Sequence, residues 1–267
     1  VSEILLEGLQ RLEYRGYDSA GLSVYSNGDL GRLRRVGKVA ELRRAHGEHP
    51  LPGSLGIAHT RWATHGKPTE ANAHPHVSSD AVSVVHNGII ENHEPLRRQL
   101  IAAGYVFTSE TDTEVIAHLF HQEVAKAGDL LIGVKNGLRQ LDGAYAIVMI
   151  HRDYPDHIVA ARVGSPLVIG LGIGENFVAS DTHALRPVTD RFIYLQEGEV
   201  ADLTADAIRI DGADGDVLDV MDMVDVIRRR TVQVNDREDA SDKGQYRHFM
   251  LKEIYEQPST VMATLEG

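Results

Sequence analysis

The sequence predicts an α+β protein built mainly from short strands. Short apolar runs rich in Val and Ile recur through most of the chain, whereas helical periodicity is confined to the first residues and to one block near the middle. Strands that follow one another and are interrupted once by helices favour a layered α+β architecture, because in a parallel α/β sheet strands and helices alternate. The content of 42% hydrophobic and 25% charged residues is that of an ordinary globular protein.

The first element is a helix. One helical stripe collects the apolar residues Val1, Ile4, Leu5, Leu9 and Leu12. The chain opens with valine inside or next to this helix. We therefore expect that the intact protein carries a segment before it.

A β-hairpin is expected next. The stretches AGLSVY and LGRLRRV flank Asn27-Gly28, and Asn-Gly favours a two-residue turn because both residues tolerate positive φ. Further strands are expected at 55–60, 82–86, 143–151, 157–163, 166–170, 175–179 and 191–195. Helices are expected at 92–103, 112–127 and 129–141.

The chain changes character after residue 215. A charged, poorly periodic stretch follows and ends in Asp-Lys-Gly, as a linker would. Helical periodicity then returns in YRHFMLKEIYEQPSTVMATLEG. We predict a first domain over 1–215, a linker over 216–244 and the start of a truncated second domain over 245–267.

Composition excludes several classes of protein. The formal charge of −12 argues against a nucleic-acid surface, which needs clustered Lys and Arg. No apolar run approaches the roughly 18 residues of a membrane helix, and no signal-peptide pattern is present, so we expect no membrane contact and a cytoplasmic location. The absence of cysteine excludes disulfides and thiolate metal sites in the chain as given.

Two patterns have the residue types of a metal site and of a dinucleotide-binding loop, but they lack the spacing or the context that such sites require. The histidines of HTRWATHG, NAHPH and HNGIIEN lack the helical spacing of a metal-binding motif, so no metal is expected. The glycine-rich run 170–174 leads into a strand, whereas a dinucleotide-binding loop leads into a helix. We therefore expect a turn there and no cofactor.

Four polar clusters could carry chemistry, and the first two are EYRGYDSAG and HTRWATHG. In the first, Gly16 could simply cap the opening helix, with Arg15 near the negative end of its dipole. In the second, Arg61 could clamp a carboxylate through two parallel N–H bonds and Trp62 could cover a ligand. The alternative is that Arg61 pairs with a surface acid and Trp62 belongs to the core.

The third cluster is HNGIIEN. Asn-Gly again suggests a hairpin, but only Ile89 and Ile90 precede helix-like residues, which scarcely leaves room for a returning strand. The Asn87 side-chain amide and the Gly88 N–H could instead converge on a developing negative oxygen, as an oxyanion hole requires.

The fourth cluster is SETDTEV, at the start of an expected helix. Thr111 and Glu114 fit a capping box, and Asp112 in the first turn suits the helix dipole. Asp112 could also hold the ammonium group of a ligand.

Six stretches together resemble the glutaminase half of the glutamine–fructose-6-phosphate aminotransferase family: EYRGYDSAG, HTRWATHG, NAHPH, HNGIIEN, SETDTEV and YRHFMLKEIYEQP. They occur in that family's order and cover nearly the whole chain. The resemblance implies the N-terminal-nucleophile hydrolase fold, a four-layer αββα sandwich of two antiparallel sheets between helical layers. It also implies that glutamine is hydrolysed to glutamate and ammonia. The ammonia would pass to a sugar-isomerase domain that converts fructose 6-phosphate to glucosamine 6-phosphate.

The resemblance implies which residues hold glutamine. Arg61 would grip the α-carboxylate. Thr64 and His65 would belong to the loop that closes over the substrate. Asp112, with the Gly88 carbonyl, would hold the α-ammonium group.

It also implies which residues serve catalysis. Asn87 and the Gly88 N–H would form the oxyanion hole, and Arg15 would order the surroundings of the nucleophile. Trp62 would act as a lid residue that also controls the passage of ammonia.

The nucleophile of this family is an N-terminal cysteine, whose own α-amine can serve as base. The family begins with Cys-Gly and a short apolar strand, whose typical length is about 5–6 residues. We therefore expect roughly ten residues, the nucleophile among them, to precede Val1 in the intact protein. Two alternatives stay open: an inactive glutamine-binding module, and the glutaminase half of another class II amidotransferase. The resemblance further implies a homodimer when full length.

Overall fold

A computed structural model of the chain describes residues 1–62, 66–212, 230–234, 250–251, 254–255 and 257. The chain divides into two units, Val1–Val234 and Asn235–Gly267, and the fold described here is that of the first unit. Thr64, His65 and most of the ranges 216–244 and 245–267 lie outside the described residues. None of the helices that the structure describes has the length and apolar character needed to cross a bilayer.

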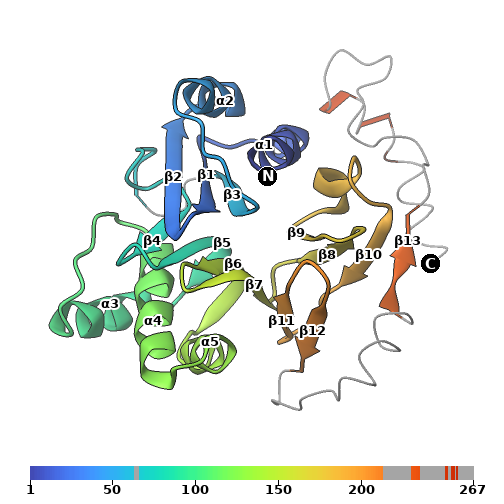
Figure 1. Cartoon of the computed structure of the whole chain (residues 1–267). Helices are drawn as coiled ribbons and strands as arrows, with labels where there is room; N and C mark the ends of the chain where they lie inside the picture. Colours follow the sequence, from blue (N-terminus) through green and yellow to red (C-terminus); the bar gives the residue numbers. More distant parts are fainter. Residues whose placement is uncertain (63–65, 213–229, 235–249, 252–253, 256, 258–267) are drawn as a thin grey trace. The chain divides into compact units, whose positions relative to one another are not determined.

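The first unit contains three antiparallel sheets (Figure 1). The first has the order β2 (Asp29–Val36), β1 (Ser19–Ser26), β3 (Leu55–Arg61). The second has the order β13 (Val232–Gln233), β10 (Arg191–Tyr194), β8 (Val168–Leu171), β9 (Asn176–Ala179). The third has the order β12 (Ile208–Asp211), β11 (Val200–Leu203), β7 (Tyr154–Val163), β6 (Gly143–His151), β5 (Val82–Ile90), β4 (His76–Ser78).

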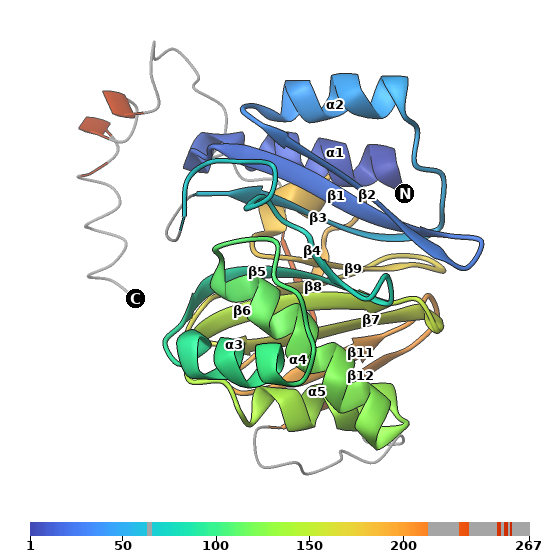
Figure 2. The same cartoon turned by 90° about the vertical axis from the view of Figure 1, so that its left-hand side faces the viewer.

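Helices cover both outer faces (Figure 2). One face carries α1 (Ser2–Arg11) and α2 (Val39–Glu48), which pack on β1 in a core with Leu6, Leu22 and Leu42. The opposite face carries α3 (His93–Ala102), α4 (Asp112–Ala127) and α5 (Leu130–Leu138). Two short 3-10 turns, η1 (Glu13–Arg15) and η2 (Thr182–Leu185), follow α1 and β9.

Strand β6 shows how the layers are joined. Side chains alternate across a strand, so one set faces the other sheets and the next faces the helices. Ala146, Val148 and Ile150 lie in the core that the six-stranded sheet shares with β3, β8 and β10. Tyr145, Ile147 and Met149 lie in the core shared with α4 and α5. The predicted α+β sandwich is confirmed, but the described strands form three antiparallel sheets instead of the two expected. The three-stranded and four-stranded sheets both face the six-stranded one.

Most predicted elements are present with shifted ends. The hairpin turn has positive φ at both Asn27 (51°) and Gly28 (93°), as predicted. The glycine-rich run 170–174 covers the end of β8 and the turn that leads into β9. Strand β5 continues to Ile90 instead of ending at residue 86, because residues 87–90 keep pairing with β6. Among the described elements, the sequence analysis did not predict α2, β4, β11, β12, β13 and the 3-10 turns η1 and η2.

Candidate active site

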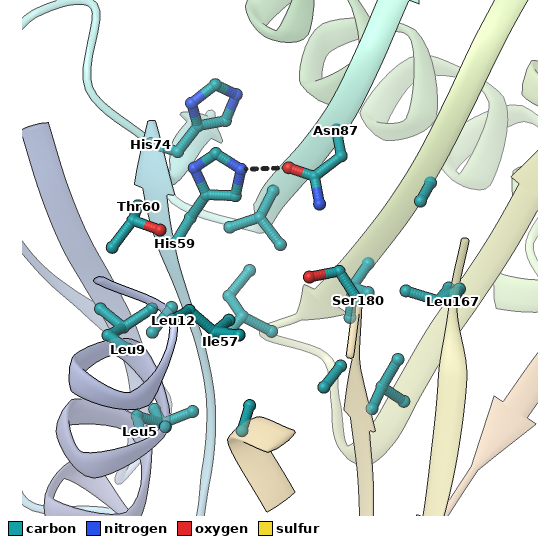
Figure 3. Close-up of a pocket in the computed structure, with 18 of the residues that line it drawn as sticks. Leu5, Leu9, Leu12, Ile57, His59, Thr60, His74, Asn87, Leu167 and Ser180 are labelled. Atoms are coloured by element: carbon teal, nitrogen blue, oxygen red, sulfur yellow. Dashed lines mark hydrogen bonds between the residues drawn. The ribbon is translucent and has the colours of Figure 1, made fainter. Parts of the chain in front are cut away.

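A cavity of about 720 Å³ lies between β3 and β9. The consecutive residues 54–62 line it along β3, and residues 175–180 line it along β9. Figure 3 shows Leu5 and Leu9 of α1 near Ile57 in one part of this cavity, and His59, His74 and Asn87 in another. The cavity therefore has an apolar part next to a polar one, as small-molecule sites commonly do.

Both strands that border the cavity have one open edge. Among the described strands, β3 pairs only with β1, and β9 pairs only with β8. An open edge presents unpaired N–H and C=O groups to whatever lies beside it. These two edges line the same cavity, so the structure leaves room between them for further backbone.

The apolar stripe of α1 is divided between the core and the cavity. Leu6 and Leu9 are buried, at 0% and 5% exposed. Val1 and Ile4 are 37% and 36% exposed and line the cavity. The stripe predicted from the sequence omitted Leu6, whose side chain lies on the face toward β1 and α2.

Arg61 is the last residue of β3 and is only 4% exposed. Its Nη1 lies 3.8 Å from the Asp18 carboxylate. Burial lowers the pKa of Arg61, while the Coulombic attraction of Asp18 and Asp112 acts in the opposite direction. A guanidinium nevertheless stays protonated in proteins. The result is a buried cation beside a cavity, a suitable partner for an anionic group.

Asn87 and Gly88 lie in the middle of β5, opposite Ala146 and Tyr145 of β6. The hairpin alternative for this dipeptide is therefore wrong, because the strand runs straight through it. Gly88 has φ +132°, and a Cβ built there would lie 2.0 Å from the Ala144 carbonyl oxygen. Only glycine fits this position, where the backbone itself lines the cavity.

Asp112 is the first residue of α4 and is 5% exposed. Its Oδ2 accepts a hydrogen bond from the Ile90 N–H at 2.9 Å, which ties α4 to the end of β5. The capping box is only half formed. Thr111 accepts from the Glu114 N–H, but the Glu114 carboxylate accepts from Thr108 and Ser109 instead of returning to Thr111.

Arg15 and Asp181 form an ion pair of 2.5 Å between η1 and the residues that follow β9. Arg15 also donates to Ser180, and Tyr14 donates to Asp181. Burial would raise the pKa of Asp181, but its hydrogen bonds from the His183 N–H and from Tyr14, together with the charge of Arg15, hold that pKa below its usual range. This network joins the two sides of the cavity.

Trp62 is 67% exposed, so the alternative that places it in the core is wrong. Its ring lies against Gly16, where a Cβ would approach within 2.5 Å of Trp62 Cζ3. Gly16 has φ +77° and ends the η1 turn. The glycine is therefore needed both for its backbone conformation and for contact with the indole.

Four histidines adjoin the polar end of the cavity from three strands and the loop before β4. His59 contacts Asn87, His74 and His86 contact the Thr113 hydroxyl at 2.8 Å and 3.0 Å, and His76 contacts the Thr111 hydroxyl at 3.0 Å. Burial lowers the pKa of His59 to about 4 and lowers those of His74 and His76 well below 6.5. These three rings are therefore neutral near pH 7. Within the described residues, no group of three or more His, Cys, Asp or Glu side chains is arranged to hold a metal.

The structure brings together every described residue that the sequence analysis singled out. The cavity is lined by Arg15, Arg61, Trp62, Asn87, Gly88 and Asp112. The sequence analysis missed Asp181 as the partner of Arg15 and His59 as the partner of Asn87. No local signal could have found them, because these partners are 166 and 28 residues apart in the chain.

The comparisons with known proteins agree with this geometry. Residues 59–187 match the family model described as a glutamine amidotransferase domain. This match, and a sandwich of antiparallel sheets similar to that of solved glutamine amidotransferases, indicate a glutamine amidotransferase domain of the N-terminal-nucleophile hydrolase type.

Within that class, the chain is similar over its whole length to glutamine–fructose-6-phosphate aminotransferase (isomerizing). It is 60% identical over 268 aligned residues to the enzyme of Pseudomonas aeruginosa and 58% identical to that of Escherichia coli K12. In both cases all of this chain is covered, and it spans 42% of the relative's length.

Solved structures place the chain among the same amidotransferases. The glutamine phosphoribosylpyrophosphate amidotransferase of Bacillus subtilis matches 80% of this chain and 47% of its own, with a TM-score of 0.67 and 26% identity. A class-II glutamine aminotransferase domain protein of Silicibacter pomeroyi, with a TM-score of 0.51 and 17% identity over 72% of this chain and 90% of its own, shows the fold alone. Identity is thus far higher to the fructose-6-phosphate enzymes, which disfavours the glutaminase half of another class II amidotransferase.

Proposed function

We propose that this domain hydrolyses the side-chain amide of glutamine and releases ammonia. The observation that carries the proposal is the convergence, in one cavity, of a buried guanidinium, a buried carboxylate and a strand that presents Asn87 and Gly88. Arg61 binds the α-carboxylate of glutamine, and Asp112 binds the α-ammonium group. Opposite charges at fixed positions orient the amino acid and leave its side-chain amide beside Asn87.

Gly88 offers both of its backbone groups to the substrate. Beyond Val84 no described strand pairs with the outer edge of β5, and on that edge the Ile90 N–H donates to Asp112. Backbone groups of alternate residues face the same edge of a strand, so those of Gly88 face this open edge as well. The Gly88 C=O accepts from the α-ammonium group. The Gly88 N–H and Asn87 Nδ2 donate to the oxygen that becomes negative.

In this proposal the nucleophile is the N-terminal cysteine of the resembled family, which stands at the start of a short apolar segment that the chain as given does not contain. That segment forms a strand between β3 and β9, which extends the first sheet into the second. Support comes from the two open edges that line one cavity and from the exposed, apolar Val1 and Ile4 beside it. Neighbouring strands lie roughly 4.8 Å apart, so one strand bridges two edges about 10 Å apart.

The reaction proceeds through a thioester. The sulfur attacks the amide carbon as the thiol proton passes to the α-amine of the same cysteine, and the carbonyl oxygen becomes an oxyanion. An α-amine has a pKa of about 7.7–8.0, so it can accept a proton near neutrality. When the C–N bond breaks, the ammonium returns the proton to the departing nitrogen, which leaves as ammonia. Water then attacks the thioester, which yields glutamate and regenerates the thiol.

Trp62, Arg15 and the loop containing Thr64 and His65 complete the site in this proposal. Arg15 orders the backbone near the nucleophile through its ion pair with Asp181. Trp62 covers the substrate and controls the passage of ammonia. In the full-length protein, the ammonia is used by a sugar-isomerase part, which begins near residue 245 and converts fructose 6-phosphate to glucosamine 6-phosphate. A homodimer and a cytoplasmic location complete the proposal.

The test compares the full-length protein with the polypeptide 1–267. We expect the full-length protein to release glutamate and ammonia from glutamine in equal amounts. Replacing its N-terminal cysteine with alanine should abolish release while glutamine still binds, as measured by calorimetry. A full-length protein that binds glutamine without ever hydrolysing it would be a binding module. Glutamate release by a polypeptide shown by mass spectrometry to start at Val1 would refute the cysteine mechanism.

A further inference from the structure

His59 is in contact with the side chain proposed to stabilise the oxyanion. It lies two residues before the end of β3, and its Nε2 is 2.8 Å from Asn87 Oδ1 (Figure 3). In the part of the chain that the structure describes, this is the one hydrogen bond made by the Asn87 side chain. Figure 3 shows Asn87 Nδ2 on the side away from His59.

The position of one proton decides which end of the Asn87 amide faces the substrate. Burial lowers the pKa of His59 to about 4, so the ring is neutral near pH 7 and carries a single N–H. With the proton on Nε2, the ring donates to Asn87 Oδ1 and leaves Nδ2 directed away from it. With the proton on Nδ1, Nε2 would accept from Asn87 Nδ2 and the amide oxygen would turn away instead. Only the first arrangement offers a donor to an oxyanion.

The imidazole ring of His59 is held in place by its neighbours. The His74 ring lies against it at a tilt of 40° with ring centroids 4.3 Å apart, and His74 Nε2 contacts the Thr113 hydroxyl at 2.8 Å. Thr113 belongs to the first turn of α4, next to Asp112. His59 thus lies between a fixed helix end and the strand that carries Asn87.

We propose that His59 is a positioning residue for glutamine hydrolysis, because its Nε2–H holds the Asn87 carbonyl and thereby directs Asn87 Nδ2 at the developing oxyanion. His59 does not touch the reacting atoms itself. The proposal rests on the proposed function. It adds His59 to the proposed site as a residue that affects hydrolysis only by orienting Asn87.

Amide isosteres of histidine provide the test in the full-length protein. In His59→Gln the side-chain nitrogen reaches the place of Nε2, whereas in His59→Asn it reaches only the place of Nδ1. His59→Phe keeps a ring and removes the donor. We expect kcat for glutamine hydrolysis to fall about 10- to 100-fold in His59→Asn and His59→Phe, below the 10²- to 10³-fold loss of a whole oxyanion donor. His59→Gln should remain within about fivefold of the wild type, and KM should change by less than about threefold in all three, in line with a group that acts in the transition state.

A double substitution separates positioning from folding. In the background of Asn87→Ala there is no carbonyl left to hold, so His59→Asn should change kcat by less than about twofold. Equal losses in both backgrounds would overturn the proposal, and so would a His59→Gln variant as slow as His59→Asn. Melting temperatures identify any variant that does not fold. If His59→Phe does not fold, the comparison of kcat between His59→Gln and His59→Asn tests the proposal. If the wild-type protein hydrolyses no glutamine, the proposed function fails. If the wild type is active and His59→Asn equals it, only the role of His59 fails.

Discussion

Two charged side chains of this site, those of Arg61 and Asp112, are almost completely buried. Arg61 is 4% exposed and Asp112 is 5% exposed, although charged side chains are rarely buried without a partner. One carboxylate oxygen of Asp112 accepts a hydrogen bond from the Ile90 N–H. Arg61 Nη1 lies 3.8 Å from the Asp18 carboxylate. In the proposed function, Arg61 binds the α-carboxylate of glutamine and Asp112 binds its α-ammonium group.

Arg61→Lys in the full-length protein should weaken glutamine binding while the fold survives. Lysine keeps the charge but lacks the planar fork that binds a carboxylate through two parallel bonds. Losing one charge-assisted hydrogen bond corresponds to roughly 1.5–3 kcal/mol, or about ten- to a hundredfold in kcat/KM. Steady-state kinetics with glutamine is the measurement. An unchanged KM for glutamine would show that Arg61 has a structural role, such as its ion pair with Asp18, and does not bind the substrate.

Gly88→Ala should damage both stability and activity. The added Cβ would lie 2.0 Å from the Ala144 carbonyl oxygen at φ +132°, so β5 has to move away from β6. We expect a loss of about 2–4 kcal/mol in the free energy of unfolding. Gly28→Ala is the matched control, because it has φ +93° with nothing within 4 Å of the added carbon. It should cost only about 1–2 kcal/mol and leave glutamine hydrolysis unchanged. Equal losses in urea unfolding would contradict the steric argument.

At the scale of elements, the site depends on how β3, β5 and α4 are held together. Partly and fully buried histidines join them: the partly buried His59 of β3 contacts Asn87 of β5, and Thr113 of α4 lies between the buried His74 and His86. Thr111 of α4 is joined to His76 of β4 in the same way. A change in the charge of these rings therefore affects the alignment of the elements that carry Arg61, Asn87 and Asp112.

The stability of the domain should fall as pH drops from 6.5 toward 4. Burial depresses the folded-state pKa of His59, His74 and His76, so the unfolded chain binds more protons below pH 6.5. Their stabilising contribution is complete above pH 6.5 and is lost at about 1.4 kcal/mol per pH unit for each ring. Carboxylates with depressed pKa values, such as Glu114, change the free energy of unfolding only below about pH 4.5, which is outside most of this pH range.

Urea unfolding of the chain at pH 7.5 and pH 5.0 measures this effect. His74→Asn should reduce the difference between the two free energies of unfolding, because it removes one buried ring. His49→Asn is the control, since His49 is exposed and should leave the difference unchanged. Identical free energies of unfolding at both pH values would show that the buried rings do not resist protonation.

Local patterns explain which elements could be predicted from the sequence. Asn27-Gly28 and the apolar run in 143–151 specify a hairpin and a strand without help from the rest of the chain. Strand β5 was predicted four residues too short, because Asn87 and Gly88 are poor strand formers that only the pairing with β6 keeps extended. Helix α2 was missed although Val39, Leu42 and Ala45 are buried at helical spacing. That pattern was present in the sequence and was overlooked.

The residues of the candidate site were predicted from motif resemblance, whereas the contacts between them could be identified only from the three-dimensional structure. Arg61, Asn87, Gly88 and Asp112 stand in recognisable stretches, and the structure places them around one cavity. The ion pair between Arg15 and Asp181 joins residues at opposite ends of the domain's sequence. Such pairs depend on sheet order, which periodicity alone does not specify.

At the scale of the whole molecule, the cavity lies between the edge strands of two small sheets. The open edges of β3 and β9 and the exposed residues Val1 and Ile4 surround it. One inserted strand would pair with both edges, cover the apolar part of the cavity and bring its first residue toward the polar part. The same strand would therefore stabilise the domain and supply its nucleophile.

The central claim is that glutamine is hydrolysed at the polar end of this cavity, with Asn87 as an oxyanion donor. The most direct test is Asn87→Ala in the full-length protein, with kcat measured alongside the melting temperature. We predict a kcat lower by about 10² to 10³, which corresponds to roughly 2.7–4 kcal/mol, with KM nearly unchanged and normal melting. A variant that melts earlier yet hydrolyses glutamine at the wild-type rate per folded molecule would contradict the account.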